Sequence, residues 1–370
     1  MQEKIYNLSW AARKARGTEG ARRWSDWRWQ LAGSFAGAAG LAALEPLPHG
    51  MEKGAAAAAG KYPFCVTPYY LSLCDLKDRR DPLLRQILPD RRELADSGSR
   101  PDPLGESSFE PVPGLIHRYR NRAVLIATGD CAVRCRHCTR KNTLVSFADL
   151  QCRGRSSERR LLKFSSCPDS IARRLPEIIR YLRLHPEIRE VIVSGGDPLL
   201  LETTVLDRIL ESLRAVKTVE VLRIGTRVPV VLPMRVDKGL CACLKKHRPV
   251  WVNTQFNHPR EITPESERAC RMLQEAGIPV SNQAVLMRGV NDSLPVLEAL
   301  CNGLQRIMVR PYYVFQCDRV RGTRHFRVAG RKAVALSRRL RTRIGGLSMP
   351  LFVVDIPGRK SKVPLEMWPE

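Results

Sequence analysis

The chain has 370 residues, a hydrophobic fraction of 44%, a formal net charge of +25 and a pI near 10.1. Its length and apolar content fit one large α/β core or two smaller ones and argue against an intrinsically disordered chain. The excess of lysine and arginine indicates either a polyanionic partner or an arginine-rich proteome, and composition does not separate the two.

Twelve cysteines are spread unevenly along the chain, without a secretory signal before them. This pattern predicts free thiols in a reducing compartment, so we expect a cytoplasmic protein rather than a disulfide framework. The one membrane-like run, Leu31 to Leu44, has 14 residues, which is too short to span a bilayer and too far from the N-terminus for a signal peptide. No membrane partner is expected.

The first part of the chain, to about residue 60, is basic and then rich in alanine and glycine. Trp24, Trp27 and Trp29 lie close together, and a low-complexity run follows at Ala55 to Ala59. These features predict a peripheral helical segment, and we expect residues 1–115 to form an N-terminal helical extension.

From Arg118 onward, short apolar runs of β type alternate with stretches of helical periodicity. The predicted strands are 123–128, 190–194, 219–224, 250–256, 280–286 and 307–314, and the predicted helices are 170–184, 204–215, 236–246, 264–276, 292–305 and 331–344. These strand–helix units predict an α/β fold, a TIM-like (βα)6 barrel, closed or partly closed, over residues 116–345. A last apolar run, 351–354, belongs to a C-terminal segment at 346–370.

The most informative motif follows the first predicted strand and has the spacing C-x3-C-x2-C, formed by Cys131, Cys135 and Cys138. Three thiolates can hold three irons of a [4Fe-4S] cluster and leave the fourth iron open. An open iron is what radical S-adenosylmethionine (SAM) chemistry requires. A zinc site would favour four ligands in paired C-x2-C units, and a c-type haem motif needs histidine where Thr139 stands.

A second motif, Gly195-Gly196-Asp197, follows the second predicted strand. An isolated Gly-Gly-Asp is ordinarily a strand-to-helix turn. One βα unit after the cysteines, it becomes a candidate for holding the amino group of SAM, because glycines allow close backbone approach and the acid can accept from an ammonium.

Beyond these motifs, the chain resembles the lysine 2,3-aminomutase family of radical SAM, pyridoxal phosphate (PLP) enzymes over about residues 62 to 366, with a weaker echo near Trp27. The stretches that carry the resemblance are WSDWRWQL, TPYYLSL, VPGLIHRYRNRAVL, CRHCTRK, VIVSGGDPLL, LRIGTRVPVVLP, FNHPREIT, GIPVSNQAVLMRGVND, RPYYVFQCD and FVVDIPGRKSKVPL. The resemblance implies a partial barrel of the radical SAM type followed by a short segment that carries the PLP lysine.

The resemblance also implies roles for individual residues. Lys362 matches the lysine that forms the PLP Schiff base, although a lysine in a basic tail is usually a solvated one. Asp318 and Asp355 match two carboxylates that grip the side-chain ammonium of lysine, and Arg140 matches the guanidinium that pairs with its carboxylate. Each of these taken singly would read as a surface ion-pair residue, whereas together they make a sensible clamp.

Three further positions carry looser matches. Gln283 resembles a SAM-contacting position, and Arg122 with Tyr119 resembles a pair that contacts the cofactor.

The reaction that the resemblance implies is an isomerisation. PLP holds L-lysine as an imine, and a 5'-deoxyadenosyl radical takes hydrogen from C3. The nitrogen then migrates from C2 to C3, and hydrogen returns to C2. The product is β-lysine, SAM is regenerated, and an electron donor such as flavodoxin or ferredoxin is implied.

The sequence also departs from the family. Longer members carry a cysteine-rich C-terminal tail that binds zinc across subunits, together with a cysteine after the GVND turn. Here the chain ends at Glu370 and Ser293 follows that turn, so zinc is not expected and a homo-oligomer is left open. Gln255 stands where the family has a histidine, and the segment 142–170 is longer and more basic than the family pattern.

Three alternatives stay open at the level of sequence. The short C-terminus, DPLLRQIL and the CAVRC start of the cysteine motif also resemble the enzymes that make β-lysine for modification of elongation factor P. The charge of +25 would suit a radical SAM enzyme that acts on RNA. A degenerate homologue would hold the cluster and PLP without turnover.

Overall fold

A nine-stranded sheet forms the centre of the molecule, in a computed structural model that describes residues 17–44, 52–144 and 168–367. The strand order is β11-β10-β9-β8-β7-β6-β5-β4-β3, so neighbours in the sheet follow one another along the chain. The strands from β4 to β10 run parallel, and β3 and β11 add antiparallel edges. The strands are β3 Leu115–Tyr119, β4 Arg122–Thr128, β5 Glu190–Gly195, β6 Val221–Gly225, β7 Val250–Thr254, β8 Val280–Leu286, β9 Arg310–Gln316, β10 Leu351–Val354 and β11 Val363–Pro364.

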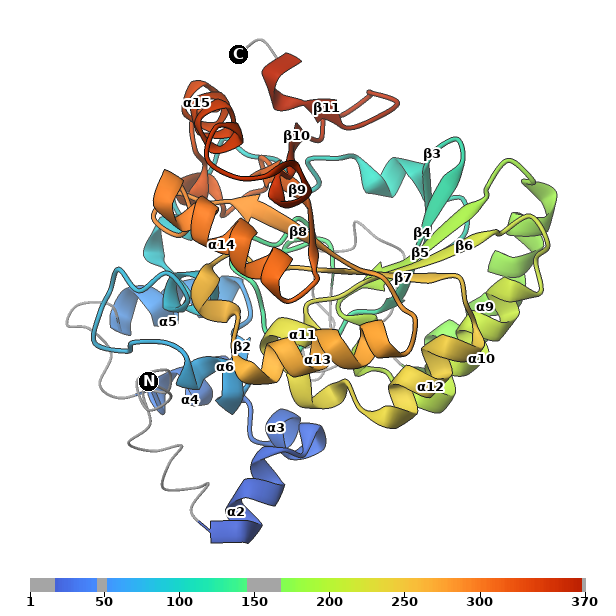
Figure 1. The fold of residues 1–370 in the computed structure, drawn as a ribbon, viewed down its shortest axis with the longest axis horizontal. Coiled ribbons are helices and arrows are strands. Elements are labelled where there is room, and N and C mark those ends of the chain that lie inside the picture. The colour runs from blue at the N-terminus through green and yellow to red at the C-terminus, as the bar shows by residue number, and fades with distance from the viewer. Residues whose placement is uncertain (1–16, 45–51, 145–167, 368–370) are drawn as a thin grey trace.

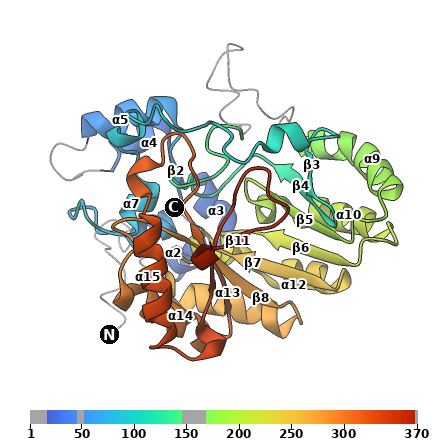
Figure 2. The same ribbon diagram turned by 90° about the horizontal axis from the view of Figure 1, so that it is seen from above.

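Helices follow the parallel strands and cover the outer face of the curved sheet (Figures 1 and 2). They are α9 Pro168–Leu184, α10 Thr203–Arg214, α11 Val228–Val231, α12 Lys238–Lys246, α13 Pro264–Glu275, α14 Leu294–Arg306 and α15 Gly330–Arg341. The 3₁₀ turns are η1 Arg91–Glu93, η2 Glu106–Phe109, η3 Pro198–Leu200, η4 Pro233–Arg235, η5 Pro259–Glu261, η6 Arg324–Phe326, η7 Gly346–Ser348 and η8 Leu365–Met367. The predicted partial barrel with alternating strands and helices is therefore confirmed, in its open form.

The alternation of side chains along each strand explains why this sheet has two different faces. On β5, Val191 and Val193 are fully buried in the core that also contains Leu206 of α10, whereas Ile192 and Ser194 line an interior cavity. Successive side chains of a strand point to opposite faces. One face of the sheet therefore anchors the helices while the other is free to build a site.

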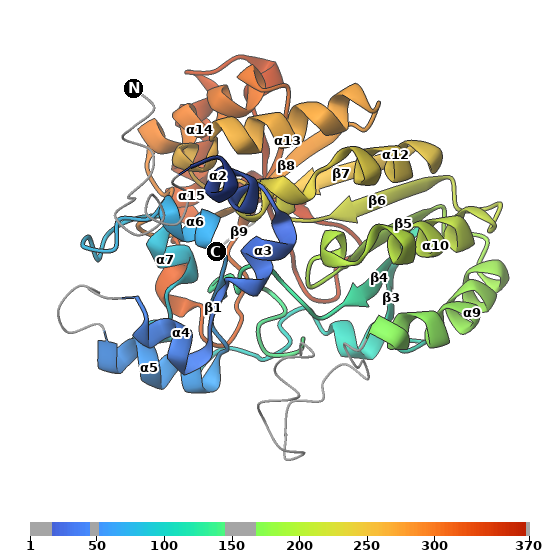
Figure 3. The same ribbon diagram turned by 90° about the horizontal axis from the view of Figure 1, so that it is seen from below.

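The N-terminal region contributes α2 Gly17–Trp24, α3 Trp27–Ala32, β1 Phe35–Ala36, α4 Gly37–Ala42, α5 Glu52–Lys61, β2 Cys65–Val66, α6 Pro68–Ser72 and α7 Leu84–Ile87. These elements lie on the side of the molecule away from α9 (Figure 3). Within residues 1–115, which were expected to form a helical, peripheral region, many residues of 62–88 are buried in the main core. The Tyr70 hydroxyl donates to Glu261 at 2.6 Å and Thr67 donates to the Val231 carbonyl at 2.7 Å, so this segment is fixed to the loops that follow β6 and β7.

The open edges of the barrel are bridged by side chains rather than by backbone pairing. Arg118 of β3 reaches the segment after β10, where it contacts Asp355 at 2.9 Å and donates to the Ile356 carbonyl at 2.7 Å. This contact connects β3, at one edge of the sheet, with the segment between β10 and β11 at the other edge. No helix among the described residues is long and apolar enough to cross a membrane.

Candidate active site

A cavity of about 1730 Å³ lies at the carboxyl ends of the parallel strands. Alternate residues of the strands line it, such as Ile192 and Ser194 of β5 and Tyr313 and Phe315 of β9. The loops that follow the strands complete its wall, which is where barrels of this kind place their sites. All thirteen site residues predicted from the sequence line this cavity: Tyr119, Arg122, Cys131, Cys135, Cys138, Arg140, Gly195, Gly196, Asp197, Gln283, Asp318, Asp355 and Lys362.

The three motif cysteines lie on the loop that leaves β4. Burial raises the pKa of Cys131 and of Cys138, and the charge of Cys135 raises both further. This mutual influence places the three thiols close together, and Arg227 donates to the Cys135 sulfur at 2.8 Å. The other cysteines among the described residues do not line the cavity, so the donor set is three thiols, which fits a [4Fe-4S] cluster with one open iron.

A buried ion cluster supports this loop from behind. Arg136 is 2% exposed and places its guanidinium on Glu93, with distances of 2.9 and 2.5 Å to the two carboxylate oxygens. Lys141 contacts the same carboxylate at 2.6 Å, and burial together with Arg136 lowers its pKa to about 8. Although burial alone would raise the pKa of Glu93, the two cations bring it below its usual value. Sequence reasoning missed this cluster, although two of its members lie inside CRHCTRK.

The Gly-Gly-Asp turn packs tightly against the start of the cysteine loop. A Cβ on Gly196 would lie 2.1 Å from the Asp130 carbonyl oxygen, and one on Gly195 would lie 2.4 Å from the Thr128 carbonyl oxygen. Gly195 also has a φ of +119°, a conformation that favours glycine. These glycines are therefore required for the close approach of two backbones, before any ligand is considered.

The carboxylate of Asp197 accepts four hydrogen bonds from described residues. It accepts from the Thr226 hydroxyl at 2.6 Å and from three backbone N–H groups, those of Arg227 at 2.7 Å, Val228 at 3.1 Å and Leu199 at 3.2 Å. Burial raises its pKa to about 6 against the opposing effect of these donors. Its contact with the SAM amino group stays a prediction, and what the structure gives it is a role in joining the loops after β5 and β6.

Lys362 lies opposite Asp355 on the hairpin formed by β10 and β11, which arches over the sheet in Figure 2. The pairing of Val354 with Val363 sets this arrangement, and the two charged groups are 3.8 Å apart. Burial lowers the pKa of the Lys362 amine, and nearby arginines lower it further. A larger fraction of Lys362 is therefore present as the free amine, which is the form that attacks a carbonyl.

Three arginines surround this lysine on the cavity wall, Arg118, Arg122 and Arg223. The Nε atoms of Arg118 and Arg223 are buried and have no hydrogen-bond partner among the described residues, whereas buried polar groups in native proteins ordinarily have one. Nε–H groups that no described residue pairs, on guanidinium groups beside a lysine amine, fit the phosphate of PLP. Of the three arginines, only Arg122 was predicted. The position of Arg223, a charged residue within the apolar strand sequence LRIG, was a signal from which a second arginine of the site could have been found.

The predicted substrate residues lie in the same cavity, and their charges are paired with other protein groups to different degrees. Arg140 is paired with Glu106 through two contacts of 2.7 Å each. The Asp355 carboxylate forms an ion pair with Arg118 and also accepts a hydrogen bond from the Tyr119 hydroxyl at 3.2 Å. Asp318 accepts from the Thr139 hydroxyl at 2.7 Å, and burial raises its pKa to about 6, with Asp355 and Glu106 adding to the rise.

His137 and Gln255 meet deeper in this wall, with 3.3 Å between a ring nitrogen and the amide nitrogen. Burial and the nearby Arg227 lower the pKa of His137 well below its usual value, so this histidine is neutral. Its Nδ1 is buried and has no hydrogen-bond partner in the part of the chain that the structure describes, and Gln283 of β8 lines the same cavity. Sequence reasoning did not single out His137, which lies between two motif cysteines.

Comparison with known proteins gives matches along most of the chain. Residues 125–298 match the radical SAM superfamily. L-lysine 2,3-aminomutase from Clostridium subterminale is 43% identical over 343 residues, which cover 92% of this chain and 78% of that protein. The enzyme of the same name from Fusobacterium nucleatum is 40% identical, covering 92% of this chain and 76% of that protein.

Two further similarities are more distant. Glutamate 2,3-aminomutase from Clostridioides difficile is 34% identical over 342 residues, covering 92% of this chain and 76% of that protein. Among solved structures, Streptococcus suis SuiB bound to precursor peptide SuiA has a TM-score of 0.43 and 14% sequence identity, covering 64% of this chain and 49% of that chain.

Proposed function

The chain belongs to the L-lysine 2,3-aminomutase family within the radical SAM superfamily, and from this premise we propose that it converts L-lysine to β-lysine by moving the amino group from C2 to C3. The enzyme is then an isomerase that performs an intramolecular amino transfer. The observation that carries the proposal is that one cavity contains the three thiols, the amine of Lys362 and two carboxylates.

The residues present fit the three cofactors that this reaction uses, a [4Fe-4S] cluster, SAM and PLP. When bound, the cluster and SAM supply a carbon-centred radical that removes hydrogen, and PLP holds the nitrogen that migrates. Cys131, Cys135 and Cys138 would ligate the cluster. Lys362 would hold PLP, and the Nε–H groups of Arg118 and Arg223, which have no hydrogen-bond partner among the described residues, would face its phosphate.

The charges in the cavity favour lysine over glutamate as the substrate. Asp318 and Asp355 together offer two carboxylates to the ammonium at the end of the lysine side chain. The same pair would repel the side-chain carboxylate of glutamate, since like charges brought together in a partly buried site are destabilising. This distinction matters because the relatives include both a lysine and a glutamate aminomutase.

Arg140 would receive the α-carboxylate of the substrate as a bidentate donor. In the structure Glu106 already occupies that fork through two hydrogen bonds. The substrate carboxylate must therefore displace or share this glutamate, which selects for a ligand that also gains contacts at its other end.

Two partners remain predictions from the family resemblance. One is a small electron donor such as flavodoxin or ferredoxin, which would reduce the cluster. The other is a second copy of the chain in a homo-oligomer.

The test is an anaerobic assay of protein reconstituted with iron, sulfide and PLP, given L-lysine, SAM and dithionite and followed by chromatography. We expect β-lysine, and no product when SAM is omitted. Absence of β-lysine from protein with verified cluster and PLP would overturn the proposal. Conversion of L-glutamate at a comparable rate would overturn the choice of substrate and leave the reaction type in place.

A further inference from the structure

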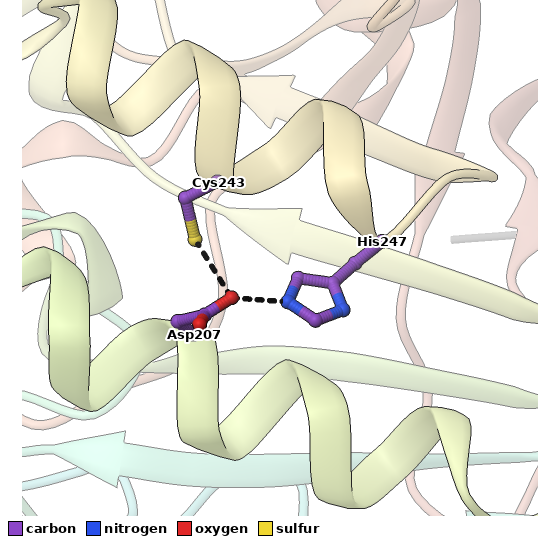
Figure 4. Close-up of side chains that lie close together, drawn as sticks. All are labelled: Asp207, Cys243 and His247. Atoms are coloured by element: carbon purple, nitrogen blue, oxygen red, sulfur yellow. Dashed lines mark hydrogen bonds and ion pairs between the residues drawn. The ribbon is translucent and has the colours of Figure 1, made fainter.

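A second group of metal-ligating side chains lies outside the cavity, between α10 and α12. Asp207 comes from α10, and Cys243 and His247 come from α12 and the residue that ends it. Figure 4 shows the three side chains pointing toward one another across the gap between the helices. Their potential ligand atoms all lie within 4.8 Å of one another.

Helical spacing explains how the two helices build this group. Cys243 and His247 are four residues apart and therefore share one face of α12. That face meets α10 at Asp207, whose Oδ1 is 2.5 Å from His247 Nε2 and 3.8 Å from Cys243 Sγ. The donors thus come from two elements that the fold already holds in contact.

The chemistry of the donors is that of a zinc ligand set. Thiolate, imidazole and carboxylate all bind Zn²⁺, at about 2.3 Å for sulfur and about 2.0–2.2 Å for nitrogen and oxygen. Tetrahedral angles at such bond lengths separate the donor atoms by roughly 3.3–3.8 Å. The observed separations of 2.5 and 3.8 Å require shifts of roughly 1 Å, which side-chain rotation supplies.

The surroundings are closed on one side and open on the other. Cys243 is 8% exposed and His247 is 5% exposed, whereas the Asp207 side chain is 32% exposed. A metal ion can therefore enter past the carboxylate and be held against buried sulfur and nitrogen. Burial and the charge of Asp207 raise the pKa of the Cys243 thiol to about 11, so the metal must displace its proton.

Lys246 is the competing cation at this place. Its ammonium lies 3.2 and 3.0 Å from the two carboxylate oxygens of Asp207, and its side chain is 54% exposed. Glu211, one turn after Asp207, is 4.0 Å from the same ammonium and offers it a second acid. The Lys246 ammonium can therefore leave Asp207 for Glu211. While it remains beside Asp207, its positive charge should weaken metal binding.

We propose that Asp207, Cys243 and His247 form a binding site for a zinc ion, with water as the fourth ligand, that joins α10 to α12 on the outside of the barrel. None of the three residues lines the active-site cavity, so the ion has a structural or regulatory role. The expectation that zinc is absent concerned a C-terminal tail and a cysteine after the GVND turn, a different place in the chain.

The experiment measures zinc bound to protein that carries its iron–sulfur cluster, so that iron occupies the three cavity cysteines. Chelator-buffered zinc is titrated, bound zinc is counted by elemental analysis, and the ligands are identified by zinc X-ray absorption. We expect one zinc per chain with a single sulfur ligand in the wild type. Cys241→Ser, which alters another buried cysteine of α12, should leave binding unchanged.

Cys243→Ser and His247→Gln should each lower zinc affinity on the order of tenfold or more, and Cys243→Ser should remove the sulfur signal. Lys246→Gln should raise the affinity, and because this residue is exposed the variant also decides the matter if the buried substitutions prevent folding. The proposal is overturned if the wild type binds no more zinc than Cys243→Ser, if the bound zinc lacks sulfur, or if Lys246→Gln binds no more tightly than the wild type. None of these readouts depends on turnover.

Discussion

Replacing Asp318 by asparagine is the sharpest test of the proposed substrate clamp. Asp318 follows β9 in the cavity wall, and its carboxylate accepts one hydrogen bond from the Thr139 hydroxyl, at 2.7 Å. Asparagine keeps the shape and can keep this contact. The substitution therefore removes the charge that would meet the lysine ammonium and little else.

The expected loss follows from the burial of the site. Removing one partner of a desolvated charge pair costs about 2–5 kcal/mol, and the lower part of that range applies because Asp355 remains. A loss of about 2–3 kcal/mol corresponds to roughly a 30- to 150-fold decrease in kcat/KM for L-lysine. Because the ammonium is remote from the migrating nitrogen, we expect most of the loss as a higher KM.

The pH dependence gives an independent readout. Burial raises the pKa of Asp318 to about 6, so the carboxylate becomes protonated as the pH falls through this value. In the wild type, kcat/KM for lysine should then decrease below about pH 6, and in Asp318→Asn this acidic limb should be absent. Burial also raises the pKa of Asp197 to about 6. An acidic limb that persists in Asp318→Asn is therefore assigned to a group other than Asp318, such as Asp197.

The assay is the anaerobic initial rate of β-lysine formation at saturating SAM, across pH values on both sides of 6. Glu298→Gln serves as the control, because this acid pairs with Arg343 on the surface and does not line the cavity. A decrease in kcat/KM below threefold in Asp318→Asn, or an acidic limb unchanged in that variant, would refute the assignment of Asp318 to the clamp.

Three further outcomes are expected. Glu93→Gln leaves a buried guanidinium and a buried ammonium without their carboxylate, which should lower the stability to denaturant by about 3–5 kcal/mol and reduce iron per chain; an unchanged denaturation midpoint would contradict this. Gly196→Ala brings a Cβ to 2.1 Å from the Asp130 carbonyl oxygen, so the variant should lose cluster iron after reconstitution, and full iron content would show that the backbone can give way. Lys362→Ala should abolish PLP absorbance and turnover while Lys360→Ala, at an exposed neighbouring position, retains both; equal absorbance in the two variants would remove Lys362 from its role.

The repeating part of the fold was predictable because its signals are local. The strand 280–286 and the run 351–354 match β8 and β10 to the residue, and the predicted helices differ from the observed ones by a few residues at their ends. Val, Ile and Leu are frequent in β5, β6 and β10, and each strand from β5 to β9 is followed by a helix before the next strand begins. β3 was missed because LIHRY is half polar, and β11 because two residues carry no periodicity.

The charged residues were less predictable because a count of charges does not say where they lie. Arg136, Arg227 and Arg235 are all buried, where they hold carboxylates, carbonyls and loop segments in place. Part of the charge of +25 is therefore used inside the fold, and composition could not separate this from a surface for a polyanion. The same limit hid Glu93, since a buried acid between two cations has no signature in sequence.

The balance of charges around Asp355 links cofactor loading to substrate binding. In the structure Asp355 is already paired with Arg118 at 2.9 Å and with Lys362 at 3.8 Å, whereas the carboxylate of Asp318 accepts a hydrogen bond from the Thr139 hydroxyl. If Lys362 holds PLP as proposed, it would no longer offer a free ammonium to Asp355, and the Nε–H of Arg118 would be available to the phosphate. Asp355 would then be free to join Asp318 in receiving the lysine ammonium, so we expect the complete clamp in protein that carries its cofactor.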